Sequence, residues 1–110
     1  MNKYVFIFLV LFSCVSQAQD FYIVKWTASW CGPCKQWNLN ERSKIEQTVQ
    51  VIDIDIDKYP KLAKRYNIKS VPTFFICGVD DRMVYTKHIG YTSSSTLTKS
   101  IKQLKDKSND

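Results

Sequence analysis

The sequence predicts an α/β domain in which a four-stranded mixed sheet, connected in the order β-α-β-α-β-β-α, is flanked by helices. Three observations predict this fold. An apolar, β-rich run at residues 21–26 precedes a proline-containing helical segment, and residues 50–57 then alternate apolar and acidic side chains. Two further short strands, separated by a turn, precede a segment with helical spacing. A chain of 110 residues allows one such domain.

The first half of the domain is expected to be a strand–helix–strand unit. The run Phe21–Trp26 is mostly apolar on both faces, as a central sheet strand should be. Pro33 is tolerated in the first turn of a helix, because its missing N–H would have no partner there. We therefore expect a helix from about residue 31 to about residue 47, followed by the alternating strand within residues 50–57.

The second half is expected to contain a short helix, a hairpin and a closing helix. Asp57 or Lys58 is expected near the N-cap of the short helix. The closing helix is serine-capped, repeats apolar residues at a spacing of three or four, and is followed by a polar, frayed tail. The expected bounds are 57–66 for the short helix, 73–77 and 83–89 for the strands, and 94–105 for the closing helix.

Residues 1–18 have the pattern of a secretory signal peptide. Lys3 precedes a short apolar run, and Ser16 and Ala18 lie at positions −3 and −1 of a cleavage site. A transmembrane helix needs about 20 apolar residues, which this run does not supply. We expect residues 19–110 to form the domain, in a periplasm or secreted. The alternative is a membrane-anchored lipoprotein acylated on Cys14, which ends a sequence similar to a lipobox.

The net charge of +6 does not by itself indicate a nucleic-acid partner. The basic residues are spread along the chain. Those within residues 58–69 form a loose cluster, and they have helical spacing. We interpret that cluster as a solvated helix face and expect no nucleic-acid binding.

Cysteine usage is more informative. Apart from Cys14, the chain has a C-x-x-C pair, Cys31 and Cys34, and a single Cys77 in an apolar strand. A zinc site usually takes four ligands from two closely spaced pairs, and a c-type haem would need histidine where Lys35 stands. We therefore expect no metal and no other cofactor. Cys77 is expected to be a small buried hydrophobe; the alternative is a regulatory thiol.

The C-x-x-C pair is suited to disulfide exchange. That reaction needs a thiolate that attacks and a second thiol close enough to resolve the mixed disulfide. At the start of a helix, the first sulfur lies beside unpaired N–H groups at the positive end of the helix dipole, which favour its anion. This predicts that Cys31 is the nucleophile and Cys34 the resolving thiol.

Two motifs resemble the thioredoxin family. The run Trp30-Cys31-Gly32-Pro33-Cys34-Lys35 closely resembles its active-site motif, and Val71-Pro72-Thr73 resembles its cis-proline loop. Both the separation of the motifs and the order of elements between them agree with the family. The resemblance covers roughly residues 21–104.

The resemblance implies a substrate-binding surface around Cys31. Val71 and Pro72 would lie across from this cysteine, with Pro72 after a cis peptide bond and the Val71 backbone pairing with an extended substrate. Trp30 would flank the sulfurs, and Gly90 would let the substrate backbone come close. Trp30, Val71 and Gly90 could each instead serve packing or turn geometry.

The sequence departs from the family pattern in three places. The usual N-terminal strand and helix are expected to be missing, so that the strand within residues 51–56 would become a sheet edge protected by its aspartates. Leu39 replaces the proline that usually kinks the active-site helix. Lys25 stands where the family has a buried Asp, and Asp53 where it has a Lys, so the two charges look exchanged and are expected to pair near Cys34 and modulate it.

The resemblance implies an enzyme that reduces protein disulfides. Gly32 and Pro33 between the cysteines are similar to the dipeptide of reducing members. The implied partners are protein disulfide substrates and an electron-donating reductase, with the chain acting as a monomer. The alternatives are a disulfide oxidase or isomerase, and a non-catalytic binding module that uses the cysteines incidentally.

Overall fold

The computed structural model describes residues 20–108 of the chain. Residues 1–18, expected to be a signal peptide, and Cys14 lie outside the described residues. Within the part that is described, none of the helices has the length and apolar character needed to cross a membrane.

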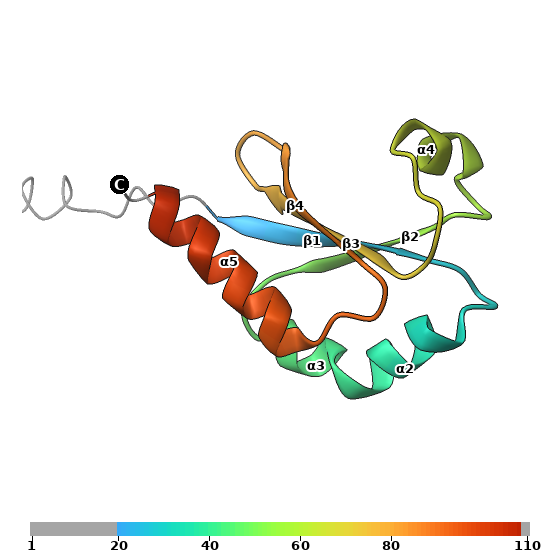
Figure 1. The fold of residues 1–110 in the computed structure, drawn as a ribbon, viewed down its shortest axis with the longest axis horizontal. Helices are drawn as coiled ribbons and strands as arrows, with labels where there is room; N and C mark the ends of the chain where they lie inside the picture. Colours follow the sequence, from blue (N-terminus) through green and yellow to red (C-terminus); the bar gives the residue numbers. More distant parts are fainter. Residues whose placement is uncertain (1–19, 109–110) are drawn as a thin grey trace, which may run out of the picture.

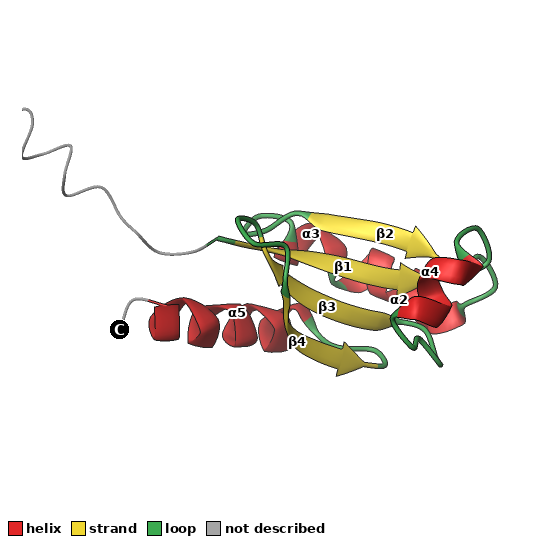
Figure 2. Ribbon diagram, turned by 90° about the horizontal axis from the view of Figure 1, so that it is seen from above, coloured by secondary structure: helices red, strands yellow, loops and turns green. Residues whose placement is uncertain are grey.

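Four strands form one mixed sheet in the order β2-β1-β3-β4 (Figure 2). Strand β1 pairs in parallel with β2 and antiparallel with β3, and β3 pairs antiparallel with β4. This confirms the predicted four-stranded mixed sheet and the position of β2 at its edge. The bounds are β1 (Phe21–Thr27), β2 (Val51–Asp55), β3 (Thr73–Gly78) and β4 (Val84–Ile89).

The helices lie unequally on the two faces of the sheet (Figure 1). The helices α2 (Gly32–Asn40), α3 (Arg42–Ile45) and α5 (Ser94–Ser108) cover one face, and the described part of the chain places only α4 (Pro60–Arg65) on the other. The main core lies under the three helices, where Trp37 and Leu97 pack against Ile23 and Phe74. In α5, Leu97 and Ile101 are buried and Leu104 packs beside them, as its spacing predicted.

The helix expected from about residue 31 to residue 47 is divided at Glu41, which is the C-cap of α2 and the N-cap of α3 and has a φ of −119°. The Glu41 carboxylate accepts hydrogen bonds from the Ser94 backbone N–H at 2.8 Å and the Tyr91 hydroxyl at 2.7 Å. These contacts join the end of α2 to the start of α5. The break therefore occurs at the residue that makes this long-range contact.

Two other boundaries differ from those expected. The short helix α4 begins at Pro60 with Tyr59 at its N-cap, because Asp55, Asp57 and Lys58 form a turn after β2. The last helix continues to Ser108, so residues 106–108 are helical rather than frayed.

Candidate functional site

Cys31 and Cys34 are joined by a disulfide at the start of α2, with their Cα atoms 5.3 Å apart. Cys31 is the N-cap of the helix and Pro33 lies in its first turn. The Cys34 backbone N–H donates a hydrogen bond to Cys31 Sγ at 3.1 Å. An amide at the positive end of the helix therefore points at this sulfur, and it would stabilise a thiolate there after reduction.

The two cysteines are held in a small apolar cluster. Cys31 and Cys34 are buried with Ala28, and Ile56 and Val71 pack against them. Cys34 is the more deeply enclosed, with 1% of its surface exposed against 3% for Cys31. Both cysteines are therefore buried, and Cys31 is the slightly more exposed of the two.

The Val71–Pro72 peptide bond is cis, as the resemblance implied. The Pro72 carbonyl accepts a hydrogen bond from the Gly90 N–H at 2.8 Å, which joins the loop before β3 to the end of β4. Gly90 has φ +90°, a conformation that favours glycine, and no atom lies within 4 Å of the position that a Cβ would take. The surface beside Gly90 is therefore open to an approaching backbone.

Trp30 lies at the rim of the site. Its side chain is 66% exposed, and its Nε1–H donates a hydrogen bond to Asp57 Oδ2 at 2.8 Å. At the end of β4, Ile89 is 78% exposed, and Tyr91 is exposed in the loop beside Gly90. Asp57, Ile89 and Tyr91 are not among the site residues predicted from the sequence. Ile89 and Tyr91 flank Gly90, which could have suggested them, whereas the role of Asp57 depends on a contact across 27 residues.

Lys25 and Asp53 lie together behind the disulfide. Lys25 is fully buried, with its Nζ 3.8 Å from Asp53 Oδ1 and 3.5 Å from Thr27 Oγ1. A cavity of about 200 Å³ is lined by both charged residues and by Cys34. The structure therefore places Lys25 and Asp53 next to Cys34.

The electrostatics of this pair involve a third residue, Arg42, which sequence reasoning missed. Burial lowers the pKa of Lys25, Asp53 opposes this change, and Arg42 adds to it. Arg42 also forms an ion pair with Asp53, and both cations lie over the Trp37 ring. Asp53 thus keeps a cationic partner independently of Lys25.

Cys77 lies in β3, away from the disulfide, and is a free, buried thiol. Burial raises its pKa, which disfavours the thiolate. In the described residues, no group of three or more His, Cys, Asp or Glu side chains is placed to hold a metal ion.

Comparisons with known proteins agree with this geometry. The sequence model of the family described as Thioredoxin matches residues 11–103. Thioredoxin-1 of Drosophila melanogaster is 41% identical over 58 residues, covering 50% of each chain, and a thioredoxin-like protein of Synechocystis is 43% identical over 60 residues, covering 52% of each. The chain therefore spans about half the length of these two relatives.

A solved structure extends the similarity over most of the fold. The oxidized form of mitochondrial thioredoxin 3 from Saccharomyces cerevisiae is 30% identical, with a TM-score of 0.63, over 86% of this chain and 89% of that one. Chloroplastic thioredoxin z reaches a TM-score of 0.69 at 23% identity and covers 89% of each chain, which shows a shared fold.

Proposed function

The chain belongs to the thioredoxin family, and on this premise we propose that it is a thiol–disulfide oxidoreductase that reduces disulfide bonds in client proteins. The observation that carries the proposal is the Cys31–Cys34 disulfide at the N-cap of α2, with the Cys34 N–H directed at Cys31 Sγ. The intervening Gly32 and Pro33, which resemble the dipeptide of reducing members, support the reducing direction.

In the reduced protein, the Cys31 thiolate attacks one sulfur of a client disulfide, forming a mixed disulfide and releasing the other client sulfur as a thiolate. Cys34 loses its proton and attacks Cys31 Sγ, which re-forms the internal disulfide and releases the second client sulfur. Two electrons pass from the protein dithiol to the client, whose two thiolates take up two protons. A dithiol of an electron-donating reductase must then return two electrons to the Cys31–Cys34 disulfide.

The surface around Cys31 offers binding contacts for an extended client segment. The Val71 backbone, next to the cis bond, is the candidate partner for strand-like pairing. Trp30 and the open surface at Gly90 flank the approach to the sulfur. Trp30, Val71, Pro72 and Gly90 are therefore proposed as client-binding residues.

The reduction potential of the Cys31–Cys34 couple, measured by equilibration with glutathione, tests the direction of the reaction. A value near ~−270 mV is expected for a reductase, and a value near ~−120 mV would identify an oxidant instead. The alternative, an oxidase or isomerase, is favoured by one observation: the buried Lys25 beside Cys34 would stabilise thiolate and so the reduced form. A non-catalytic binding module would keep its biological function in a Cys31→Ser, Cys34→Ser double variant.

We further propose that the protein works outside the cytoplasm as a monomer, after removal of residues 1–18. A periplasmic or secreted reductase needs electrons from a membrane-embedded reductase or from a partner thioredoxin-like protein. Acylation on Cys14 would place the same domain at a membrane surface.

A further inference from the structure

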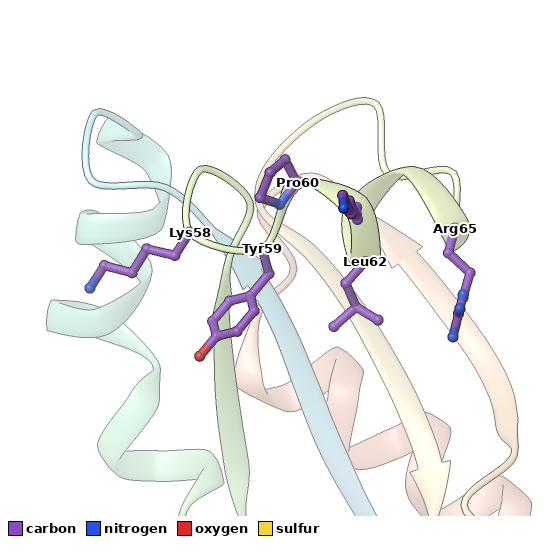
Figure 3. Close-up of a pocket in the computed structure, with 6 residues that line it drawn as sticks. Lys58, Tyr59, Pro60, Leu62 and Arg65 are labelled. Atoms are coloured by element: carbon purple, nitrogen blue, oxygen red, sulfur yellow. The ribbon is translucent and has the colours of Figure 1, made fainter.

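A groove lies along α4 and the turn before it, on the sheet face opposite α2, α3 and α5. It has a volume of about 470 Å³. Figure 3 shows Tyr59 and Leu62 pointing the same way from this segment, along the direction of the strands, with Lys58 and Arg65 at the two ends. We call this the α4 groove, and it is lined by Lys58, Tyr59, Pro60, Lys61, Leu62 and Arg65.

Ile56 and Asp57 connect the α4 groove to the redox site. Ile56 packs against the cluster that contains Cys31 and Cys34, and it also belongs to the apolar cluster that includes Leu62. The groove starts one residue after Asp57, whose carboxylate holds the Trp30 indole at 2.8 Å. A client segment that passes Trp30 on its way to Cys31 would therefore extend toward this groove.

The groove combines an apolar wall with unpaired positive charge. The Tyr59 side chain is 57% exposed. In the part of the chain that the structure describes, Lys58, Lys61 and Arg65 form no ion pair.

Asp55 and Asp57, which precede this segment in the sequence, accept hydrogen bonds from uncharged donors. Asp57 accepts the bond from Trp30, and Asp55 accepts one from the Asp57 backbone N–H at 2.8 Å. Neither carboxylate forms an ion pair with Lys58, Lys61 or Arg65 in the described residues, so these cations can pair with an external anionic group.

We propose that the α4 groove is a second part of the client-binding surface, and that it binds an acidic segment of a client protein that also carries an apolar side chain. The apolar side chain packs against Tyr59 and Leu62, while client carboxylates pair with Lys58, Lys61 and Arg65. Charge complementarity of this kind raises association rates and selects among partners. This proposal rests on the proposed reductase function, because it names the class of client that reaches Cys31.

Synthetic peptides test the proposal directly. An internal disulfide is joined through a Gly-Ser linker to Glu-Leu-Glu-Leu-Glu, and matched peptides carry Gln or Lys for Glu, or Ser for Leu. With the reduced protein, kcat/KM for the acidic peptide should exceed that for the Gln peptide by about tenfold at low ionic strength. Replacing Leu by Ser in the acidic peptide should lower kcat/KM. The preference should disappear at about 1 M salt, where the Debye length is ~3 Å.

Protein variants locate the effect. The groove variant combines Lys58→Glu with Lys61→Glu, and it should abolish the preference for the acidic peptide. The control variant makes the same charge change on exposed positions of α5, with Lys99→Glu and Lys102→Glu, and it should preserve most of the preference. Tyr59→Ser should remove the advantage of Leu over Ser in the peptide. If circular dichroism shows that the double Glu variant is unfolded, Lys58→Gln with Lys61→Gln replaces it.

Reduction of neutral hydroxyethyl disulfide separates this proposal from the proposed function. One outcome would be that wild type and all groove variants reduce hydroxyethyl disulfide equally, while the acidic and Gln peptides react with the same kcat/KM. In that case the groove proposal is wrong and the reductase function stands. The groove proposal would also be overturned if the α5 variant lost as much of the preference for the acidic peptide as the groove variant, since the net charge of the protein would then explain the effect. Failure of the wild type to reduce hydroxyethyl disulfide would contradict the reductase function itself.

Discussion

Lys25 places a buried cation where it can influence the redox-active sulfurs. Of the described residues, it is the one charged side chain that is buried, and its pKa is lowered by that burial while Asp53 opposes the change. To the extent that Lys25 carries its proton, it favours a thiolate at the site, which is the opposite of the effect of a buried carboxylate. A stabilised thiolate stabilises the reduced form of the couple.

Replacing Lys25 by Met should therefore raise the pKa of the Cys31 thiol and make the couple more reducing. The fold should tolerate the change, because Asp53 keeps Arg42 as its partner and buried charges can often be replaced by apolar residues of similar volume. A titration of thiolate absorbance in the reduced protein measures the pKa. Lys44→Met, which removes an exposed lysine of α3, is the control.

Asp53→Asn tests the same pair from the other side. Removing the anion near Cys34 should lower the pKa of the Cys31 thiol, provided that Lys25 keeps its proton. Unchanged thiol pKa values in both Lys25→Met and Asp53→Asn would show that the pair does not modulate the sulfurs.

The assignment of the two cysteines leads to a trapping prediction. Cys34→Ser removes the resolving thiol, so mixed disulfides between Cys31 and client proteins should accumulate. Cys31→Ser should accumulate none, because the more enclosed Cys34 lacks the hydrogen bond that Cys31 Sγ receives. Non-reducing gels of the two variants, isolated from cells, give the readout. Equal trapping by both variants would contradict the assignment of Cys31 as the nucleophile.

At the scale of elements, Glu41 couples the end of α2 to the start of α5. Hydrogen bonds from the Ser94 backbone N–H and the Tyr91 hydroxyl lower the pKa of Glu41. A carboxyl whose pKa is lower in the folded state stabilises the fold above its unfolded pKa, and this contribution is lost as pH falls through the folded pKa. Because Tyr91 adjoins Gly90, the same contact helps to position the loop beside the redox site.

Glu41→Gln should lower the free energy of unfolding by about 0.5 kcal/mol at neutral pH, since a partly exposed charge at a helix N-terminus is screened by solvent. The difference from wild type should shrink as the pH falls below the Glu41 pKa. Urea unfolding at neutral and acidic pH measures both effects. Glu46→Gln, which removes a surface partner of Arg42, is the matched control, and it should lack the loss specific to the α2–α5 contact. A pH-independent difference for Glu41→Gln would rule out the charge as its cause.

The elements that could be predicted are those determined by local pattern. Alternation located β2, and the spacing of Leu97, Ile101 and Leu104 identified the buried side of α5. The break at Glu41 could not be predicted, because its partner Ser94 lies 53 residues away.

The same distinction between local and long-range information applies at the site. The two sequence motifs located the disulfide and the cis bond. The contact of Trp30 with Asp57 and that of Arg42 with Asp53 arise only when β2 is placed beside β1.

At the scale of the whole molecule, the two sheet faces have different coverage, and this is why client selection is proposed beside α4. The face under α2, α3 and α5 holds the main core. The other face holds the cluster around Trp26 and Phe75, and the only described helix that packs on it is α4. The sheet face beside α4 carries one short helix among the described residues, so a partner protein can approach it. The main core on the other face is covered by three helices. Helices α2 and α4 lie on opposite faces of the sheet but near the same end of it, and the redox site is at that end.

The structure also bears on where a processed chain would start. The Val79 N–H donates a hydrogen bond to the Asp20 carbonyl, so the chain is part of the fold from Asp20 onward. Cleavage after Ala18 would leave Gln19 ahead of this contact. From the cleavage-site pattern at Ser16 and Ala18 we predict that exported protein begins at Gln19, which intact-mass measurement would show. A mass that includes a diacylglyceryl group on Cys14 would instead identify a lipoprotein, with residues 15–19 linking the lipid to the domain.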